Sequence, residues 1–211
     1  MYNRTNRHSV AALTTTALLT ALMLVLSYTP LGFIPIGAIS ITIVHLPVLI
    51  GLMVQGLPTG LFLGTLFGVI SLLRSLTPTG LLDPFFINPL ISVLPRALIP
   101  LAAWGVYRLA LKALAGRKGA QHAAVAAGAL CGSIVNTAGV LGMLYLLYGG
   151  SIAEAMGIAQ GAVGGVLLTI AVTNGVPEAV VSMVLTPAVA LAVNRAMHAG
   201  TRHNTRRMRA A

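Results

Sequence analysis

Ionisable side chains are scarce in this sequence, and acidic ones are the scarcest. Only 8% of the 211 residues are charged, and Asp and Glu together number 3. A soluble domain carries about a quarter charged residues, so this composition excludes an ordinary soluble protein. With 57% hydrophobic residues and a mean hydropathy of +0.93, the chain is predicted to be an integral membrane protein.

Motifs of hydrolytic and metal-dependent chemistry are also missing. The sequence contains no Walker A motif, no H-E-x-x-H and no G-x-S-x-G, so the chain does not itself hydrolyse ATP and shows no sign of these catalytic sites. Its single cysteine, Cys131, excludes an internal disulfide and a cysteine metal site; it is expected to be a small core residue. We therefore expect no catalytic residue, no metal and no cofactor, and an enzyme is disfavoured.

Basic residues are concentrated at three places, which explains the formal net charge of +10 without nucleic acid as a partner. They precede the first apolar span, follow the fourth and follow the last, whereas the other loops contain almost no Lys or Arg. This is the positive-inside pattern of a protein with an even number of spans and both termini in the cytoplasm. Its partner is accordingly the lipid bilayer of a bacterial or archaeal cytoplasmic membrane.

Span length divides the chain into about six helices, because each crossing needs about 20 mostly apolar residues. The predicted fold is a single all-α membrane domain (1–211), a six-helix bundle with N-in/C-in topology and an outward-facing ligand cavity. The apolar loop 29–40 could fold over the bundle as a lid, and residues 173–177 should interrupt the last apolar region. The expected helices are 9–28, 41–55, 58–74, 89–114, 123–148 and 175–197, with a short outer segment at 161–173 and a basic, disordered tail at 201–211.

Glycine recurs every fourth residue across the third span, at Gly56, Gly60, Gly64 and Gly68. This spacing places the glycines on one helix face, where the lack of side chains lets a neighbouring helix approach closely. Tight helix packing is the first interpretation of this face. The same region of the chain also contains His45 and Arg96, and polar groups at membrane depth indicate a functional site.

Five polar residues are expected at similar depth in the outer half of the bundle. From the rise of 1.5 Å per residue, each lies within about three turns of the outer end of its helix. Buried charged groups so placed face the interior and pair with one another or with a ligand. The candidate substrate-binding residues are His45, Arg96, Asn136, Asn174 and Glu178.

Each candidate also has a purely structural explanation. His45 could bond a carbonyl that Pro47 leaves free, and Asn136 could join two helices. Arg96 and Glu178 could form an ion pair that only stabilises the bundle. Arg74 is expected to reach the membrane interface and Asp83 to be a turn residue, so neither is a binding candidate.

Several short motifs, in their order and spacing, resemble the substrate-binding S components of energy-coupling factor (ECF) vitamin transporters, and most closely the pantothenate-type members. The resemblance covers nearly the whole chain. The Lys-x-Asp of riboflavin-type members and the Gly-Asp of folate-type members are absent. The matching stretches are Thr42-Ile43-Val44-His45-Leu46-Pro47-Val48, Gly60-Leu61-Phe62-Leu63-Gly64 with Phe67-Gly68 and Ser71, Pro95-Arg96, Asn136-Thr137, and Asn174-Gly175 with Glu178-Ala179.

The resemblance implies a transport function. An S component binds a vitamin from outside and docks on a transmembrane T component with two ATPase subunits, then topples in the membrane to release its cargo. Ala17-x-x-x-Ala21 matches the motif with which the family docks on the T component. The expected substrate is a small, anionic, water-soluble vitamin, with pantothenate as the leading hypothesis and Arg96 as the partner of its carboxylate. The alternatives are another vitamin or precursor, a scaffold without a small-molecule ligand and, third, an enzyme acting on lipid or prenyl substrates.

Overall fold

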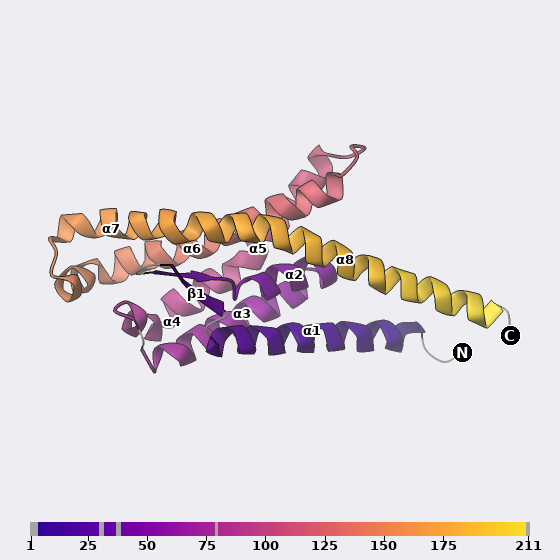
Figure 1. Ribbon diagram of the computed structural model, residues 1–211, viewed down its shortest axis with the longest axis horizontal. Helices are drawn as coiled ribbons and strands as arrows, with labels where there is room; N and C mark the ends of the chain where they lie inside the picture. The colour runs from indigo at the N-terminus through magenta and orange to yellow at the C-terminus, as the bar shows by residue number, and fades with distance from the viewer. Residues whose placement is uncertain (1–3, 30–31, 37–38, 79, 210–211) are drawn as a thin grey trace.

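The computed structural model describes residues 4–29, 32–36, 39–78 and 80–209, which form an elongated helical bundle with one β-hairpin (Figure 1). The start of α1 and the end of α8 lie at the same end of the molecule. The regular elements are α1 (Arg4–Tyr28), β1 (Phe33–Ile36), β2 (Ile39–Thr42), α2 (Leu46–Gln55), α3 (Leu57–Ser75), the 3-10 helix η2 (Asp83–Ile87), α4 (Pro89–Ser92), α5 (Leu94–Ala113), α6 (Ala120–Met156), the 3-10 helix η3 (Gln160–Ala162), α7 (Val163–Ile170), the π-helical turn η4 (Ala171–Gly175) and α8 (Val176–Arg209).

Five helical segments of the described chain are long and apolar enough to cross a membrane. They make this a multi-pass membrane protein. The expected helix at 41–55 is shorter than predicted, because residues 39–42 form strand β2 and α2 begins only at Leu46. At 1.5 Å per residue, the 10 residues of α2 extend about 15 Å, half of a bilayer core of about 30 Å.

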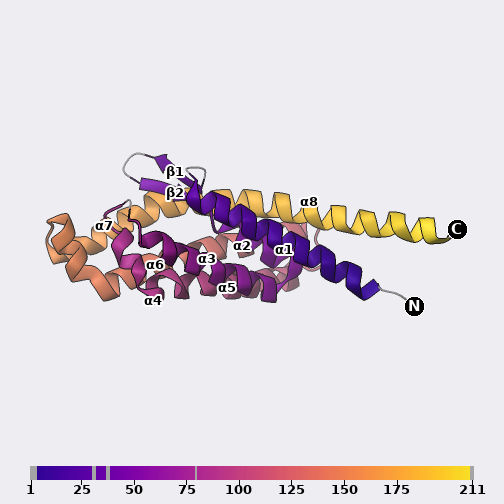
Figure 2. The same cartoon turned by 90° about the horizontal axis from the view of Figure 1, so that it is seen from below.

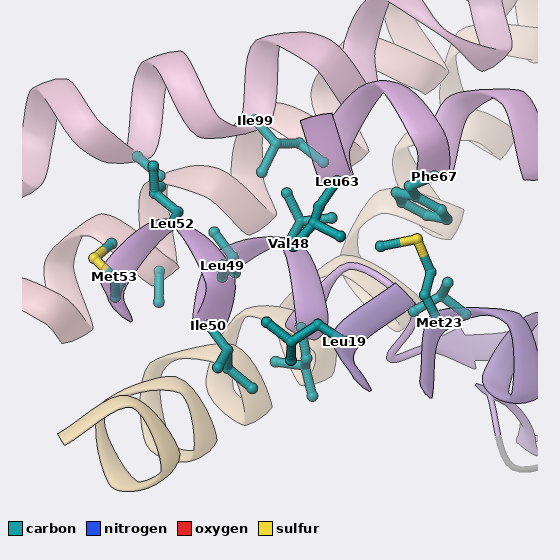
Figure 3. Close-up of a cluster of buried hydrophobic side chains, with 14 of the residues drawn as sticks. Leu19, Met23, Val48, Leu49, Ile50, Leu52, Met53, Leu63, Phe67 and Ile99 are labelled. Carbon is teal, nitrogen blue, oxygen red and sulfur yellow. The ribbon is translucent and has the colours of Figure 1, made fainter. Parts of the chain in front are cut away.

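Helix α2 lies inside the bundle, between α1, α3, α5 and α8 (Figure 2). Eight consecutive residues, Leu46 to Met53, are buried, so the helix is apolar on every side, as a fully enclosed helix must be. Val48, Leu49 and Leu52 are completely inaccessible to solvent. They pack with Leu19 and Met23 of α1, Leu63 and Phe67 of α3, and Ile99 of α5 (Figure 3).

The glycine face of α3 packs against α5, as tight helix packing predicts. A Cβ atom at Gly64 would lie 2.7 Å from the carbonyl oxygen of Arg96, and one at Gly68 would lie 2.6 Å from Cα of Val93. On the other side of α5, Gly128 of α6 approaches the carbonyl oxygen of Ala103, to which a Cβ atom would be 2.9 Å. Glycines on two neighbouring helices therefore let α5, which carries Arg96, approach both at backbone distance.

The last apolar region is one helical rod with a local irregularity, where a break was expected. Helix α7 continues through the π-helical turn η4 into α8. Pro177 comes just after the π-helical turn, where the regular helical hydrogen-bond pattern is already interrupted, so its missing N–H is accommodated there. Helix α8 extends to Arg209, so residues 201–209, expected as a disordered tail, are helical. The hairpin β1–β2 occupies the loop expected as a lid, and residues 30–31 and 37–38 of that loop lie outside the described residues.

Candidate functional site

A cavity of about 820 Å³ lies at the end of the bundle opposite the start of α1. Its walls come from the ends of α1 and α3, the start of α5, the helix η2, and the segment from α7 to η4. Because α2 begins only at Leu46, Thr42 of the preceding strand contributes to the wall. Irregular backbone at membrane depth is tolerated where it lines a cavity, and the short α2 creates such a place.

Arg96 is the buried cation of this cavity. It lies in the first turn of α5 and is only 7% exposed. Its guanidinium carbon is 5.5 Å from the ring centre of Phe67 and 5.2 Å from that of Phe86, and Nη1 donates a 2.5 Å hydrogen bond to the carbonyl oxygen of Ile91. Within the described chain, Nε is buried without a hydrogen-bond partner. The rings and the Ile91 carbonyl hold the cation in place, and no carboxylate of the described residues contacts it, since Glu178 acts on it only at longer range. Such a cation suits an anionic ligand.

Asn174 also lines the cavity. It belongs to the π-helical turn η4, and such turns inside helices are frequent at functional sites because they redirect side chains. The adjacent Gly175 faces Thr137 of α6, whose Cγ2 atom would lie 2.9 Å from a Cβ atom at this position. The close approach to α6 fixes the turn that presents Asn174.

His45 is buried next to α8 and does not line the cavity. Its Nε2 lies 2.6 Å from Oγ of Ser182, and the Ser182 hydroxyl donates a 2.7 Å hydrogen bond to the carbonyl oxygen of Glu178. A hydroxyl has one proton to donate, so Ser182 must accept the bond from His45. Nε2–H of His45 is then the donor to the hydroxyl. Nδ1 makes no hydrogen bond of good geometry with the described residues, and the backbone of Thr42 lies near the ring.

Asn136 and Glu178 are also buried without lining the cavity. Oδ1 of Asn136 has no hydrogen-bond partner among the described residues. Glu178 accepts a 2.7 Å hydrogen bond from the backbone N–H of Thr42, which fastens strand β2 to α8. No ion pair joins Glu178 to Arg96 in the described part of the chain, so the structure does not show the purely structural pair that the sequence left open.

Several cavity residues were missed by the sequence analysis. Phe67, Ser71, Arg74 and Ser75 follow one face of α3 at helical spacing and line the cavity, as does Asp83 of η2. This spacing was a signal for a common face, but Arg74 was assigned to the membrane interface. Asp83 is a turn residue, as expected, because its Oδ2 accepts a 2.7 Å hydrogen bond from the backbone N–H of Gly80, and it lines the cavity as well. Among the described residues, no group of three His, Cys, Asp or Glu side chains could hold a metal ion.

Ala17 and Ala21 lie on the exposed face of α1, at the edge of the bundle. The opposite face buries Leu19, Met23 and Leu26 in the core. The small side chains therefore lie where another helix could approach closely.

Comparison with known proteins identifies the family. The family model for the substrate-specific component of ECF transporters matches residues 11–190. The chain belongs to this family. The S component is 31% identical over 171 residues to the pantothenic acid transporter PanT of Lactococcus lactis subsp. cremoris (strain MG1363), an alignment that covers 74% of the S component and 78% of PanT. Members of this family are transport proteins and not enzymes.

Proposed function

We propose that this S component captures pantothenate from outside the cell and delivers it to the cytoplasm through a T component and two ATPase subunits. Arg96 carries the proposal: it is a buried cation that no carboxylate of the described residues contacts, and it lies on the wall of a cavity that Arg74 and Asp83 also line. A buried charge requires a partner, and the carboxylate of pantothenate is suited to be that partner. The similarity to PanT supports this choice of vitamin.

The size and the polar groups of the site support a ligand of this kind. Ligand pockets of about 300–1,000 Å³ are typical for small molecules, and the cavity measures about 820 Å³. Asn174 would bond the amide or a hydroxyl group of the ligand from the cavity wall. Nδ1 of His45 and Oδ1 of Asn136 are buried and have no hydrogen-bond partner among the described residues; a deeper ligand position would offer them partners. Glu178 would act through Thr42, whose backbone it holds.

The proposed topology has six crossings, both termini in the cytoplasm and the cavity open to the outside. Helix α2 together with the hairpin would form the sixth crossing. Basic residues support the orientation, because Arg108, Lys112, Arg117 and Lys118 flank the α5–α6 turn, which lies toward the same end as the start of α1. Ala17 and Ala21 would dock on the T component within a bacterial cytoplasmic membrane.

The test is calorimetric titration of the detergent-purified protein with pantothenate. The wild type should bind, and Arg96→Ala should lose binding, because removing the cation leaves the ligand carboxylate unpaired in a dry site. Arg96→Lys should recover only part of the affinity, since Lys lacks the planar fork. Arg108→Ala is the matched control: it removes a cation from the same helix, where Arg108 lies against Trp104 outside the cavity.

A set of B vitamins titrated in parallel separates the alternatives. Binding of another vitamin with no response to pantothenate would refute the substrate and retain the transport function. If Arg96→Ala binds pantothenate as tightly as the wild type, the carboxylate assignment is wrong.

A further inference from the structure

Two aromatic rings enclose the guanidinium of Arg96, and neither was a binding candidate. Phe67 comes from the middle of α3, where it is 4% exposed and packs beside Met23 at the edge of the core (Figure 3). Phe86 comes from the 3-10 helix η2, in the connection that follows α3. Their ring centres lie 5.5 Å and 5.2 Å from the guanidinium carbon, within the range of cation–π attraction.

The Arg96 guanidinium is anchored by one hydrogen bond and keeps donors for a ligand. Nη1 donates a hydrogen bond to the carbonyl oxygen of Ile91. Nε has no partner among the described residues and is shielded from solvent. A carboxylate binds a guanidinium best through two parallel hydrogen bonds. The guanidinium has five N–H donors and the bond to Ile91 uses one of them, so a pair of donors remains for a carboxylate. Rotation out of this plane would break the bond to Ile91 and is opposed by the two rings.

The position of Phe86 is itself fixed by α6. The neighbouring ring of Phe85 lies 5.0 Å from that of Tyr148, and Nδ2 of Asn88 donates a 3.2 Å hydrogen bond to the Tyr148 hydroxyl. Tyr148 lies at the kink of α6, with φ −132° and ψ 16°. These contacts on both sides of Phe86 hold η2 against the bundle.

We propose that Phe86, with Phe67, is a positioning residue for substrate selection: the two rings fix the Arg96 guanidinium so that it accepts a planar carboxylate and discriminates against the corresponding alcohol. This inference rests on the proposed function, because it concerns the same ligand site. It assigns the preference for an acid over its alcohol to the rings of Phe67 and Phe86 in addition to the charge of Arg96.

The experiment compares pantothenate with panthenol, in which an alcohol replaces the carboxylate. For each protein, the ratio of the panthenol Kd to the pantothenate Kd measures carboxylate selectivity. Phe86→Leu should raise the pantothenate Kd by about tenfold, in line with a desolvated cation–π contact, and should change the panthenol Kd little. Phe86→Tyr keeps an aromatic face and should keep the ratio. Phe62→Leu is the control on α3, since Phe62 is 55% exposed and outside the cavity.

A general structural role for Phe86 gives a different result. If Phe86→Leu raises both dissociation constants equally, or leaves their ratio at the wild-type value, the inference is overturned. If the wild type binds no pantothenate, the proposed substrate fails, and the same ratio is measured with biotin and biotinol. A wild type that binds neither acid more tightly than its alcohol overturns the inference as well.

Discussion

Replacement of Gly64 by alanine tests how the close contact between α3 and α5 places Arg96. A Cβ atom at position 64 would lie 2.7 Å from the carbonyl oxygen of Arg96 and 3.2 Å from Cδ of Pro100. A backbone oxygen cannot rotate away as a flexible side chain can. Ordinary contact begins near 3.4 Å, so α5 must move from α3 by about 0.7 Å. Gly128 and Gly132 of α6 limit that movement from the other side.

The displacement should reduce both stability and affinity. Inserting a methyl group into a well-packed core costs about 1–3 kcal/mol. Moving Arg96 also shifts its guanidinium relative to Phe67, which belongs to α3. A hydrogen bond to a charged group contributes about 1.5–3 kcal/mol, so losing about half of one such bond raises the pantothenate Kd by about three- to tenfold.

Thermal unfolding in detergent and calorimetric titration measure the two effects. Gly105→Ala is the matched control, because Gly105 lies on α5 and a Cβ atom there would meet nothing within 4 Å. It should keep the wild-type Kd and a Tm at least as high, since alanine favours helix over glycine. If Gly64→Ala matches Gly105→Ala in both measurements, the close contact does not position Arg96 and the reasoning is refuted.

Three further predictions concern other parts of the molecule. Ala17→Leu and Ala21→Leu should leave the pantothenate Kd unchanged but abolish co-purification with the T component, because larger side chains prevent close helix approach; intact co-purification would contradict this docking role. Ser182→Ala should destabilise the protein by about 1–3 kcal/mol, since it leaves Nε2 of buried His45 unpaired; an unchanged Tm would contradict the stabilising role of this hydrogen bond. Tyr148→Leu should lower the ratio of the panthenol Kd to the pantothenate Kd, as Phe86→Leu does, because η2 loses its contacts with α6; a wild-type ratio would exclude this anchoring role.

Local spacing in the sequence predicted the parts of the fold that depend on neighbouring turns of one helix. The four-residue glycine repeat of α3 indicated close packing, and Gly64 and Gly68 indeed approach the backbone at the start of α5. Arg96 was singled out because a charge at membrane depth needs a partner, and the structure places it on a cavity wall. Asn174 was expected beside an interruption of the last helix and lies in the π-helical turn.

Other features depend on contacts between distant segments and were not predictable in this way. Phe86 lies near Arg96 on η2, which packs against α3 and α4, and the adjacent Asn88 contacts Tyr148 from 60 residues away along the chain. The hairpin was not predicted, because the high hydropathy of this region favoured a membrane helix. Residues 33–42 alternate Ile with other residues around Gly37, which is a strand signal. The sequence analysis instead divided these residues between a loop and a membrane helix. Pro47 in the first turn of α2 was the available signal for a later helix start.

Native mass spectrometry of the detergent-purified S component, followed by titration with pantothenate and other B vitamins, tests the central claim most directly. We expect a mass increase equal to one bound pantothenate in the wild type and its loss in Arg96→Ala, with Arg108→Ala unchanged. Retention of pantothenate by Arg96→Ala, or no pantothenate adduct in the wild type at saturating vitamin, would contradict the account.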